Sequence, residues 1–133
     1  MEDAKDVGRR EAGFSPQSST PVAVVESEIA REILAIHVES YGHGAANVRA
    51  HVLDDTVVVL LDGLELEPGE ELLIAEGDAD AVIAMRKEFQ QAIAATFSAV
   101  IERSTGRRVN AFASQQQVSE PRFAAEIFRL APD

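Results

Sequence analysis

Residues 78–104 carry the pattern of one long amphipathic helix, and this segment constrains the fold more than any other. Its mainly apolar stripe recurs every three or four residues, as expected for the buried face of a helix. The stripe consists of Val82, Met85, Phe89, Ile93, Thr96 and Val100. At about 1.5 Å per residue the helix would be roughly 40 Å long, more than a small domain requires. We therefore expect part of it to pack against a second copy of the chain in a homodimer; the alternative is a helix lying diagonally over a four-stranded sheet.

Apolar and polar residues alternate in other parts of the chain, which predicts strands. The strand-like segments are residues 46–53, 56–61, 109–114 and 123–130. A first helix ends at Gly42, and it starts either at Thr20-Pro21 or behind a cap at Ser27. A short helix follows Pro68. The order α-β-β-α-α-β-β predicts an α+β fold of two layers, in which helices cover one face of a four-stranded antiparallel sheet.

Length and composition limit the classes of protein that this chain can be. A chain of 133 residues is expected to form one domain, which we assign to residues 21–131 behind a disordered, polar tail at residues 1–20. The absence of cysteine excludes disulfides and thiol chemistry. No apolar run approaches the about 20 residues that cross a bilayer, so we expect a cytoplasmic protein without direct membrane insertion. The net charge of −11 repels phosphate backbones, so no nucleic acid is expected as a partner.

Three arginines follow one another closely at the end of the long helix pattern. They are Arg103, Arg107 and Arg108. The ordinary explanation is that cations at this end complement the negative end of the helix dipole. The alternative is that they bind an anion or an acidic partner protein.

The sequence Tyr41-Gly42-His43-Gly44 is a candidate binding site for a small molecule or an ion. The two glycines would allow the backbone to approach a ligand closely, and histidine, the residue type between them, is the side chain whose ordinary pKa lies near physiological pH. In the structural alternative, Gly42 and Gly44 end the first helix, His43 lies at its negative end, and Tyr41 packs under the sheet.

The remaining polar candidates do not indicate catalysis. His37, His43 and His51 match no zinc-binding spacing, so no metal site is predicted. Ser114 and Gln115 begin a polar segment between two strands, which could bind a peptide or a partner's strand, although a plain hairpin loop is the simpler interpretation. The sequence places no base near Ser114 that would make it a nucleophile. We therefore expect no catalytic residue and no cofactor.

Several segments, taken in order, resemble the MpsC-like family, long described as a domain of unknown function. Those in the first half are Tyr41-Gly42-His43-Gly44, Val57-Val58-Val59-Leu60, Asp62-Gly63-Leu64 and Pro68. Those in the second half are Arg86 and Phe89, residues 100–109, Phe112-Ala113-Ser114-Gln115 and Glu126-Ile127-Phe128-Arg129-Leu130. The resemblance covers about residues 26–130, and the family usually has arginine where this chain has His43.

The resemblance implies association with a membrane-potential-generating system for the uptake of cations and inorganic carbon. The other components of such a system are embedded in the membrane or peripheral to it, and the resemblance carries over no catalytic residues. The leading hypothesis is a non-enzymatic cytoplasmic accessory or regulatory protein that acts through protein contacts, with a membrane transport component as partner. The alternative is a domain that binds a small molecule or an ion at the loop of residues 41–44.

Overall fold

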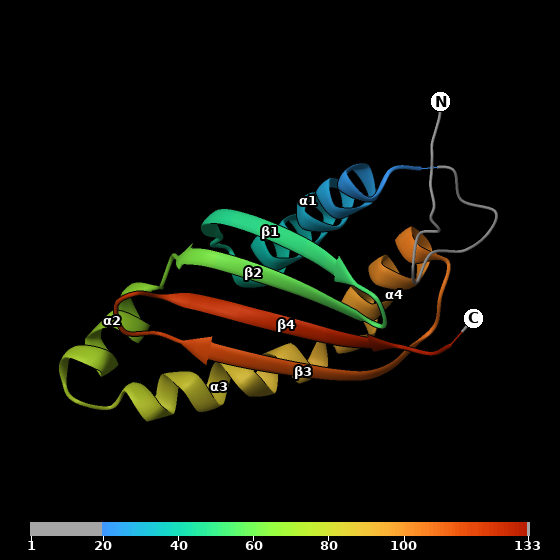
Figure 1. Ribbon diagram of the computed structural model, residues 1–133. Helices are drawn as coiled ribbons and strands as arrows, with labels where there is room; N and C mark the ends of the chain where they lie inside the picture. The colour runs from blue at the N-terminus through green and yellow to red at the C-terminus, as the bar shows by residue number, and fades with distance from the viewer. Residues whose placement is uncertain (1–19, 133) are drawn as a thin grey trace.

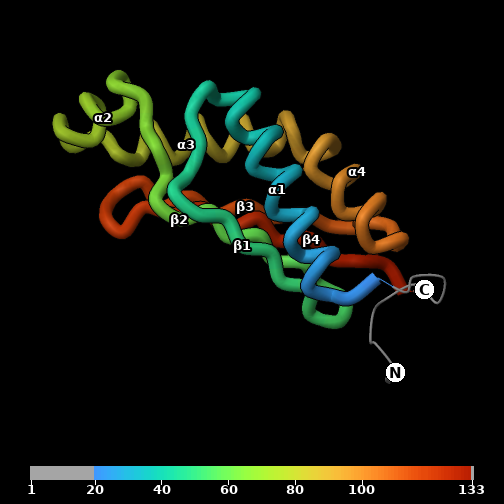
Figure 2. The backbone as a smooth tube through the Cα atoms, turned by 90° about the horizontal axis from the view of Figure 1, so that it is seen from above, coloured from blue at the N-terminus to red at the C-terminus, as the bar shows by residue number. Residues whose placement is uncertain are grey.

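The computed structural model describes residues 20–132 as four helices and a four-stranded sheet in two layers. The elements are α1 (Val22–Tyr41), β1 (Ala45–Leu53), β2 (Thr56–Leu64), α2 (Pro68–Ala75), α3 (Ala79–Ala92), α4 (Ala94–Thr105), β3 (Val109–Gln117) and β4 (Phe123–Leu130). The strands are antiparallel in the order β1-β2-β4-β3, and the helices gather on one side of the open sheet (Figure 1, Figure 2). The predicted α+β fold is confirmed. The predicted tail lies outside the described residues, except for Thr20.

Helix α1 begins directly after a proline. Pro21 has a φ of −59°, which suits a helix start, and Val22 is already helical. The predicted start at Ser27 is therefore wrong, whereas the start at Thr20-Pro21 lies within one residue of the observed one. The helix ends at Gly42, whose φ of 77° is left-handed and costs glycine less than any other residue.

The single long helix predicted over residues 78–104 is wrong, because two helices, α3 and α4, meet at Ile93. Ile93 has φ −102° and ψ 7°, outside the helical region, although no proline or glycine marks the break. Helix α3 packs against α2 and β3, whereas α4 packs against α1 and β3. Because sheets twist, a straight helix of this length could not follow both surfaces. The order of elements is therefore α-β-β-α-α-α-β-β. Because the chain has no single long helix at residues 78–104, helix length gives no reason to expect a homodimer.

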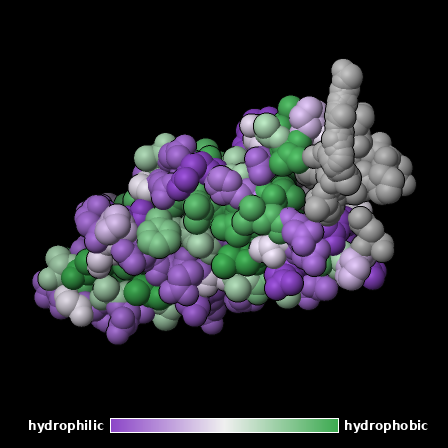
Figure 3. All heavy atoms as spheres, in the orientation of Figure 1, coloured by the Kyte–Doolittle hydropathy of each residue, from purple (hydrophilic) through white to green (hydrophobic). Residues whose placement is uncertain are grey.

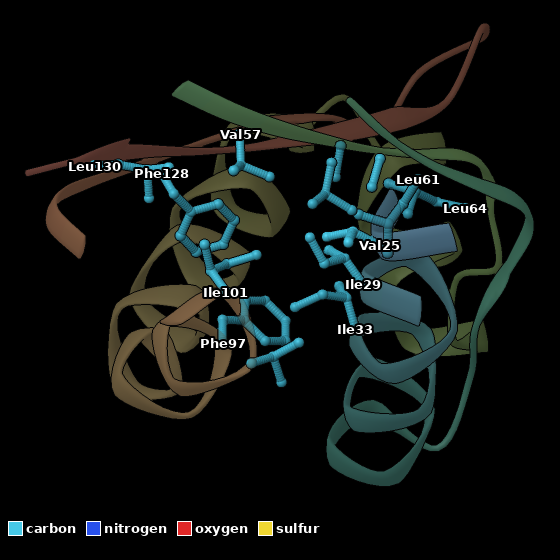
Figure 4. Packing of buried hydrophobic residues seen from close by; sticks show 14 of the residues in the cluster. Val25, Ile29, Ile33, Val57, Leu61, Leu64, Phe97, Ile101, Phe128 and Leu130 are labelled. Atoms are coloured by element: carbon cyan, nitrogen blue, oxygen red, sulfur yellow. The ribbon is translucent and has the colours of Figure 1, made fainter. Parts of the chain in front are cut away.

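The apolar core lies between the sheet and helices α1 and α4 (Figure 4). Helix α1 contributes Ile29 and Ile33, and α4 contributes Phe97 and Ile101. All four side chains are fully buried, and Phe128 of β4 completes the cluster from the sheet. Each contributes roughly 1.5–3 kcal/mol through burial, so this core holds the two layers together. The part of the domain beneath α3 is different, because α3 buries an arginine and a glutamine there.

Candidate functional site

Eight polar side chains meet inside the domain, in the part that α3 covers. Three helices and two strands supply them, and six of the eight are almost completely buried. Buried polar groups cost free energy unless they are hydrogen-bonded, so a group of this size requires a physical explanation. We call it the polar cluster; its members are His37 and Tyr41 of α1, Glu70 of α2, Arg86 and Gln90 of α3, Ser114 and Gln116 of β3, and Glu126 of β4.

Arg86 and Glu70 form a buried ion pair in this cluster. Nε of Arg86 donates to Oε2 of Glu70 over 2.8 Å, and Nη2 donates to Oε1 over 2.9 Å. Burial alone would raise the pKa of Glu70, but hydrogen bonds from Arg86 and from the backbone N–H of Glu67 hold it below its ordinary value. Both side chains are therefore charged, and they neutralise each other.

Tyr41 connects the ion pair with the rest of the cluster. The guanidinium carbon of Arg86 lies 4.7 Å from the centroid of the Tyr41 ring. The Tyr41 hydroxyl accepts a hydrogen bond from Nε2 of Gln90 over 3.0 Å and donates to the backbone oxygen of Arg86 over 3.4 Å. Burial raises the pKa of Tyr41, and the negative charge of Glu126 acts in the same direction. The phenol is therefore protonated, and it is electrostatically coupled to Glu126.

His37 is a neutral side chain on the buried face of α1. Its Nδ1 lies 3.2 Å from the backbone oxygen of His43, so Nδ1 carries the proton and donates it. Burial, and after it the positive charge of Arg86, lowers the pKa of His37 to about 4. Nε2 of His37 is consequently an acceptor, and among the described residues no donor reaches it.

Glu126 is a fully buried carboxyl group on β4, a central strand of the sheet. It pairs with Ser114 across the β3–β4 ladder, and its Oε2 accepts a hydrogen bond from Nε2 of Gln116 over 3.3 Å. Burial raises the pKa of Glu126 to about 7. In contrast to Glu70, it shares its surroundings with neutral hydrogen-bonding partners and not with a cation of its own.

Five buried atoms of the polar cluster have no hydrogen-bond partner within the part of the chain that the structure describes. One is a donor, Nη1 of Arg86. The other four are acceptors: Nε2 of His37, Oε1 of Gln90, Oε1 of Gln116 and Oε1 of Glu126. An excess of buried acceptors is satisfied by water, by a proton or by a cation.

The predicted ligand loop, residues 41–44, closes one side of the polar cluster. Gly42 ends α1, as in the interpretation in which the glycines of this loop end the first helix. The N–H of Gly44 donates to Oε1 of Glu65 over 3.0 Å, and the backbone oxygen of His43 accepts from α1. Tyr41 points between the helices into the cluster. The fold thus uses much of the polar backbone of this loop for its own contacts.

The three arginines predicted as an anion or partner site have different surroundings. Arg103 pairs at the surface with Glu32 of α1. Arg107 is buried and donates to the backbone oxygen of Ala131, at the end of β4. Arg108 is exposed. The structure therefore does not bring the three side chains together into one surface patch.

Ser114 and Gln115 do not form one site, because their side chains point to opposite faces of the sheet at β3. Strand β3 continues to Gln117, so the polar segment is the end of a strand and not a hairpin loop. Ser114 faces the helices and joins the polar cluster, where its hydroxyl accepts from Nε2 of Gln116 over 3.0 Å. Gln115 is exposed on the uncovered face of the sheet.

The uncovered face of the sheet carries a contiguous apolar area, which we call the outer patch. Its residues are Val58 and Leu60 of β2, Ala113 of β3, and Ala125 and Ile127 of β4. In the register of the sheet, Ile127 lies between Val58 and Ala113, and Leu60 lies beside Ala125. Figure 3 views this face and shows apolar atoms across its centre with polar atoms around them. Four of these five side chains are half-buried and Ala113 is exposed, so the outer patch is a candidate interaction surface.

Sequence reasoning singled out the loop and Ser114 but missed most of the polar cluster. Gln116 lies in the polar segment that begins at Ser114, whereas Glu70 and Gln90 were not predicted as site residues. Arg86 and Glu126 lie in segments that resemble the family, and this resemblance was the signal that could have identified them.

Within residues 20–132, no group of three or more His, Cys, Asp or Glu side chains is arranged to hold a metal ion.

Comparison with known proteins identifies one family. The family model described as "Na+-translocating membrane potential-generating system (MpsC)" matches residues 23–131, which include both the polar cluster and the outer patch. No curated protein and no solved structure matches the chain. In the described residues, no helix has the length and apolarity that a bilayer span requires.

Proposed function

The chain belongs to the MpsC family, and we propose that it is a non-enzymatic, cytoplasmic accessory protein of a Na+-translocating, membrane-potential-generating system. In this proposal it acts through contact with another subunit of that system. The observation that supports such a contact is the outer patch, since the central strands β2 and β4 present apolar side chains that a partner can bury.

The composition of the outer patch and its rim favours a protein as the partner over a lipid surface. Val58, Leu60 and Ile127 are only half-buried, and covering them contributes about 25 cal/mol per Å² of apolar surface. At the rim, Arg49 of β1 pairs with Asp62 of β2 over 3.0 Å, which matches the polar rim of a protein interface. The net charge of −11 repels anionic lipid headgroups. We therefore assign the patch to a subunit with a complementary apolar surface.

The test is the recovery of subunits of the system from gently solubilised membranes by the tagged, full-length chain. Leu60→Asp places a charge in the patch, and Leu72→Asp is the matched control because Leu72 is an exposed leucine on α2. We expect the unchanged chain and Leu72→Asp to recover the same subunits, identified by mass spectrometry, and Leu60→Asp to lose them. Circular dichroism checks that each variant is folded. Val58→Thr, which keeps the side-chain shape and suits a strand, is the milder second variant.

Three results would contradict the proposal. The first is equal recovery of the subunits by the unchanged chain and by folded Leu60→Asp. The second is a stable homodimer that Leu60→Asp dissociates in analytical ultracentrifugation, because a second copy of the chain would then cover the patch. The third is turnover of a small-molecule substrate by the purified chain, which would make it an enzyme.

A further inference from the structure

When Glu126 is ionised, the polar cluster contains one negative charge that no neighbouring side chain neutralises. Its charged and titratable groups besides Glu126 are His37 and Tyr41 of α1, Glu70 of α2 and Arg86 of α3. Arg86 and Glu70 cancel each other in their two-point ion pair. His37 donates from Nδ1 to a backbone oxygen and is neutral, and the Tyr41 hydroxyl is held between a donor and an acceptor. The ionised carboxylate of Glu126 is therefore the charge left over.

Three buried oxygen atoms of the polar cluster, one of them on Glu126 itself, have no hydrogen-bond partner among the described residues. They are Oε1 of Glu126, Oε1 of Gln116 and Oε1 of Gln90, all on fully or almost fully buried side chains. Gln116 donates from its amide nitrogen to Glu126 itself, and Gln90 donates from its amide nitrogen to Tyr41. Because both amide nitrogens are engaged, each amide presents its oxygen as the group without a partner.

We propose that the polar cluster binds one monovalent metal cation, of the class of Na+ or K+, through the side-chain oxygens of Glu126, Gln116 and Gln90. Carboxylate and amide oxygens are the ligands that hard cations prefer. One positive charge balances one carboxylate, whereas a divalent cation would leave an excess positive charge in the interior near Arg86. This inference is based on the cluster alone and does not depend on the proposed function. The proposed cation site lies in the interior of the domain, behind the loop of residues 41–44 that was the candidate ion-binding site in the sequence.

The experiment compares thermal unfolding of the full-length chain in NaCl, KCl and choline chloride at equal ionic strength and mildly alkaline pH. Choline is too large for a site inside the domain, so it serves as the inert cation. We expect Tm to be about 5 °C higher at saturation with Na+ or K+ than in choline, with a hyperbolic dependence on cation concentration. Glu126→Gln keeps the shape of the side chain but removes its charge, and it should lose this dependence. Glu88→Gln makes the same change at an exposed position of α3 and should keep it.

Equal Tm values in the three salts would overturn the proposal, and so would an undiminished response to Na+ or K+ in folded Glu126→Gln. If Glu126→Gln does not fold, Gln90→Met replaces it as the test, because it removes one proposed ligand oxygen and keeps the length of the side chain. For Gln90→Met, the half-saturating cation concentration should rise at least about tenfold, equivalent to 1.4 kcal/mol of binding free energy. An unchanged half-saturating concentration would overturn the proposal.

Discussion

Nε of Arg86 lies 2.8 Å from Oε2 of Glu70, and the two side chains are only 1% and 8% exposed. The pair joins α3 to α2, a short helix in which Glu70 is the one buried residue. Oε1 of Glu70 also accepts a hydrogen bond from the N–H of Glu67, at the start of α2 (2.9 Å). One carboxylate thus both caps this helix and fixes it to the domain.

Removal of the arginine from this pair should destabilise the protein strongly. Arg86→Met leaves Glu70 buried without its cation, and we expect the free energy of unfolding to fall by about 3–5 kcal/mol. Adding Glu70→Gln should restore part of the loss, because the unpaired charge is then gone. Urea unfolding measures both effects, with Glu71→Gln as an exposed control. A loss below about 1 kcal/mol for Arg86→Met would show that the pair is not important for stability.

Glu126 should make the protein less stable as the pH rises. Its pKa is 4.5 in the unfolded chain and about 7 in the folded one, so between these values the unfolded state releases a proton that the folded state keeps. In choline buffer free of metal cations, its contribution to the free energy of unfolding therefore falls by roughly 3 kcal/mol from pH 4.5 to 7. The measurement is the difference in that free energy between the unchanged chain and Glu126→Gln. A difference that stays constant with pH would contradict the raised pKa of Glu126 in the folded chain.

His37 should produce the opposite pH dependence. Its pKa is 6.5 in the unfolded chain and about 4 in the folded one, so below pH 6.5 the unfolded state takes up a proton that the folded state refuses. Its contribution to the free energy of unfolding is complete above pH 6.5 and is lost, by roughly 3 kcal/mol, as the pH falls to 4. The difference between the unchanged chain and His37→Gln should therefore grow as the pH rises through this window. A difference that shrinks instead would rule this account out.

These two slopes oppose each other where their windows overlap, between pH 4.5 and 6.5. In the unchanged chain the contributions of Glu126 and His37 should nearly cancel there. Glu126→Gln should uncover the His37 slope, so its stability should rise with pH over a range in which the unchanged chain changes little.

The fold class could be predicted because the strands are marked by local sequence patterns. Residues 56–61 form an apolar, β-branched run, and strand β2 begins at the first of them. The break between α3 and α4 could not be predicted in the same way. Ala92 and Ala94 flank Ile93, and alanine favours an unbroken helix. The break reflects the different surfaces that the two helices cover, which depend on parts of the chain that are distant in sequence.

The polar cluster escaped prediction because periodicity assumes that polar helix residues face water. The predicted stripe of α3 runs through Met85, but Met85 is 51% exposed. The buried positions of α3 are Val82, Arg86 and Gln90, at intervals of four residues. The buried face therefore includes Arg86, the polar neighbour of Met85, in place of Met85 itself. Burial of Arg86 becomes acceptable only because Glu70, from another helix, neutralises it. A pattern within one helix contains no information about that partner.

Arg107 and Arg108 are neighbours in the sequence that should respond very differently to substitution. The Arg107 guanidinium donates to the backbone oxygen of Ala131 over 2.7 and 3.1 Å and to that of Asp54 over 3.1 Å. It thereby ties the end of β4 to the turn between β1 and β2. Arg107→Ala leaves these oxygens without their donor, so we expect the free energy of unfolding to fall by about 2–4 kcal/mol. Arg108→Ala, at an exposed position, should change it by less than about 0.5 kcal/mol.

Urea unfolding of the two single variants tests this contrast, and recovery of membrane subunits tests whether either arginine also binds a partner. Arg107→Lys keeps the charge but cannot reproduce the planar fork of donors, so it should restore only part of the lost stability. If Arg107 is structural, then under conditions in which Arg107→Ala is still folded, that variant should recover subunits as well as the unchanged chain does. Normal stability of Arg107→Ala combined with lost recovery would contradict the structural role, and it would make Arg107 part of a docking site.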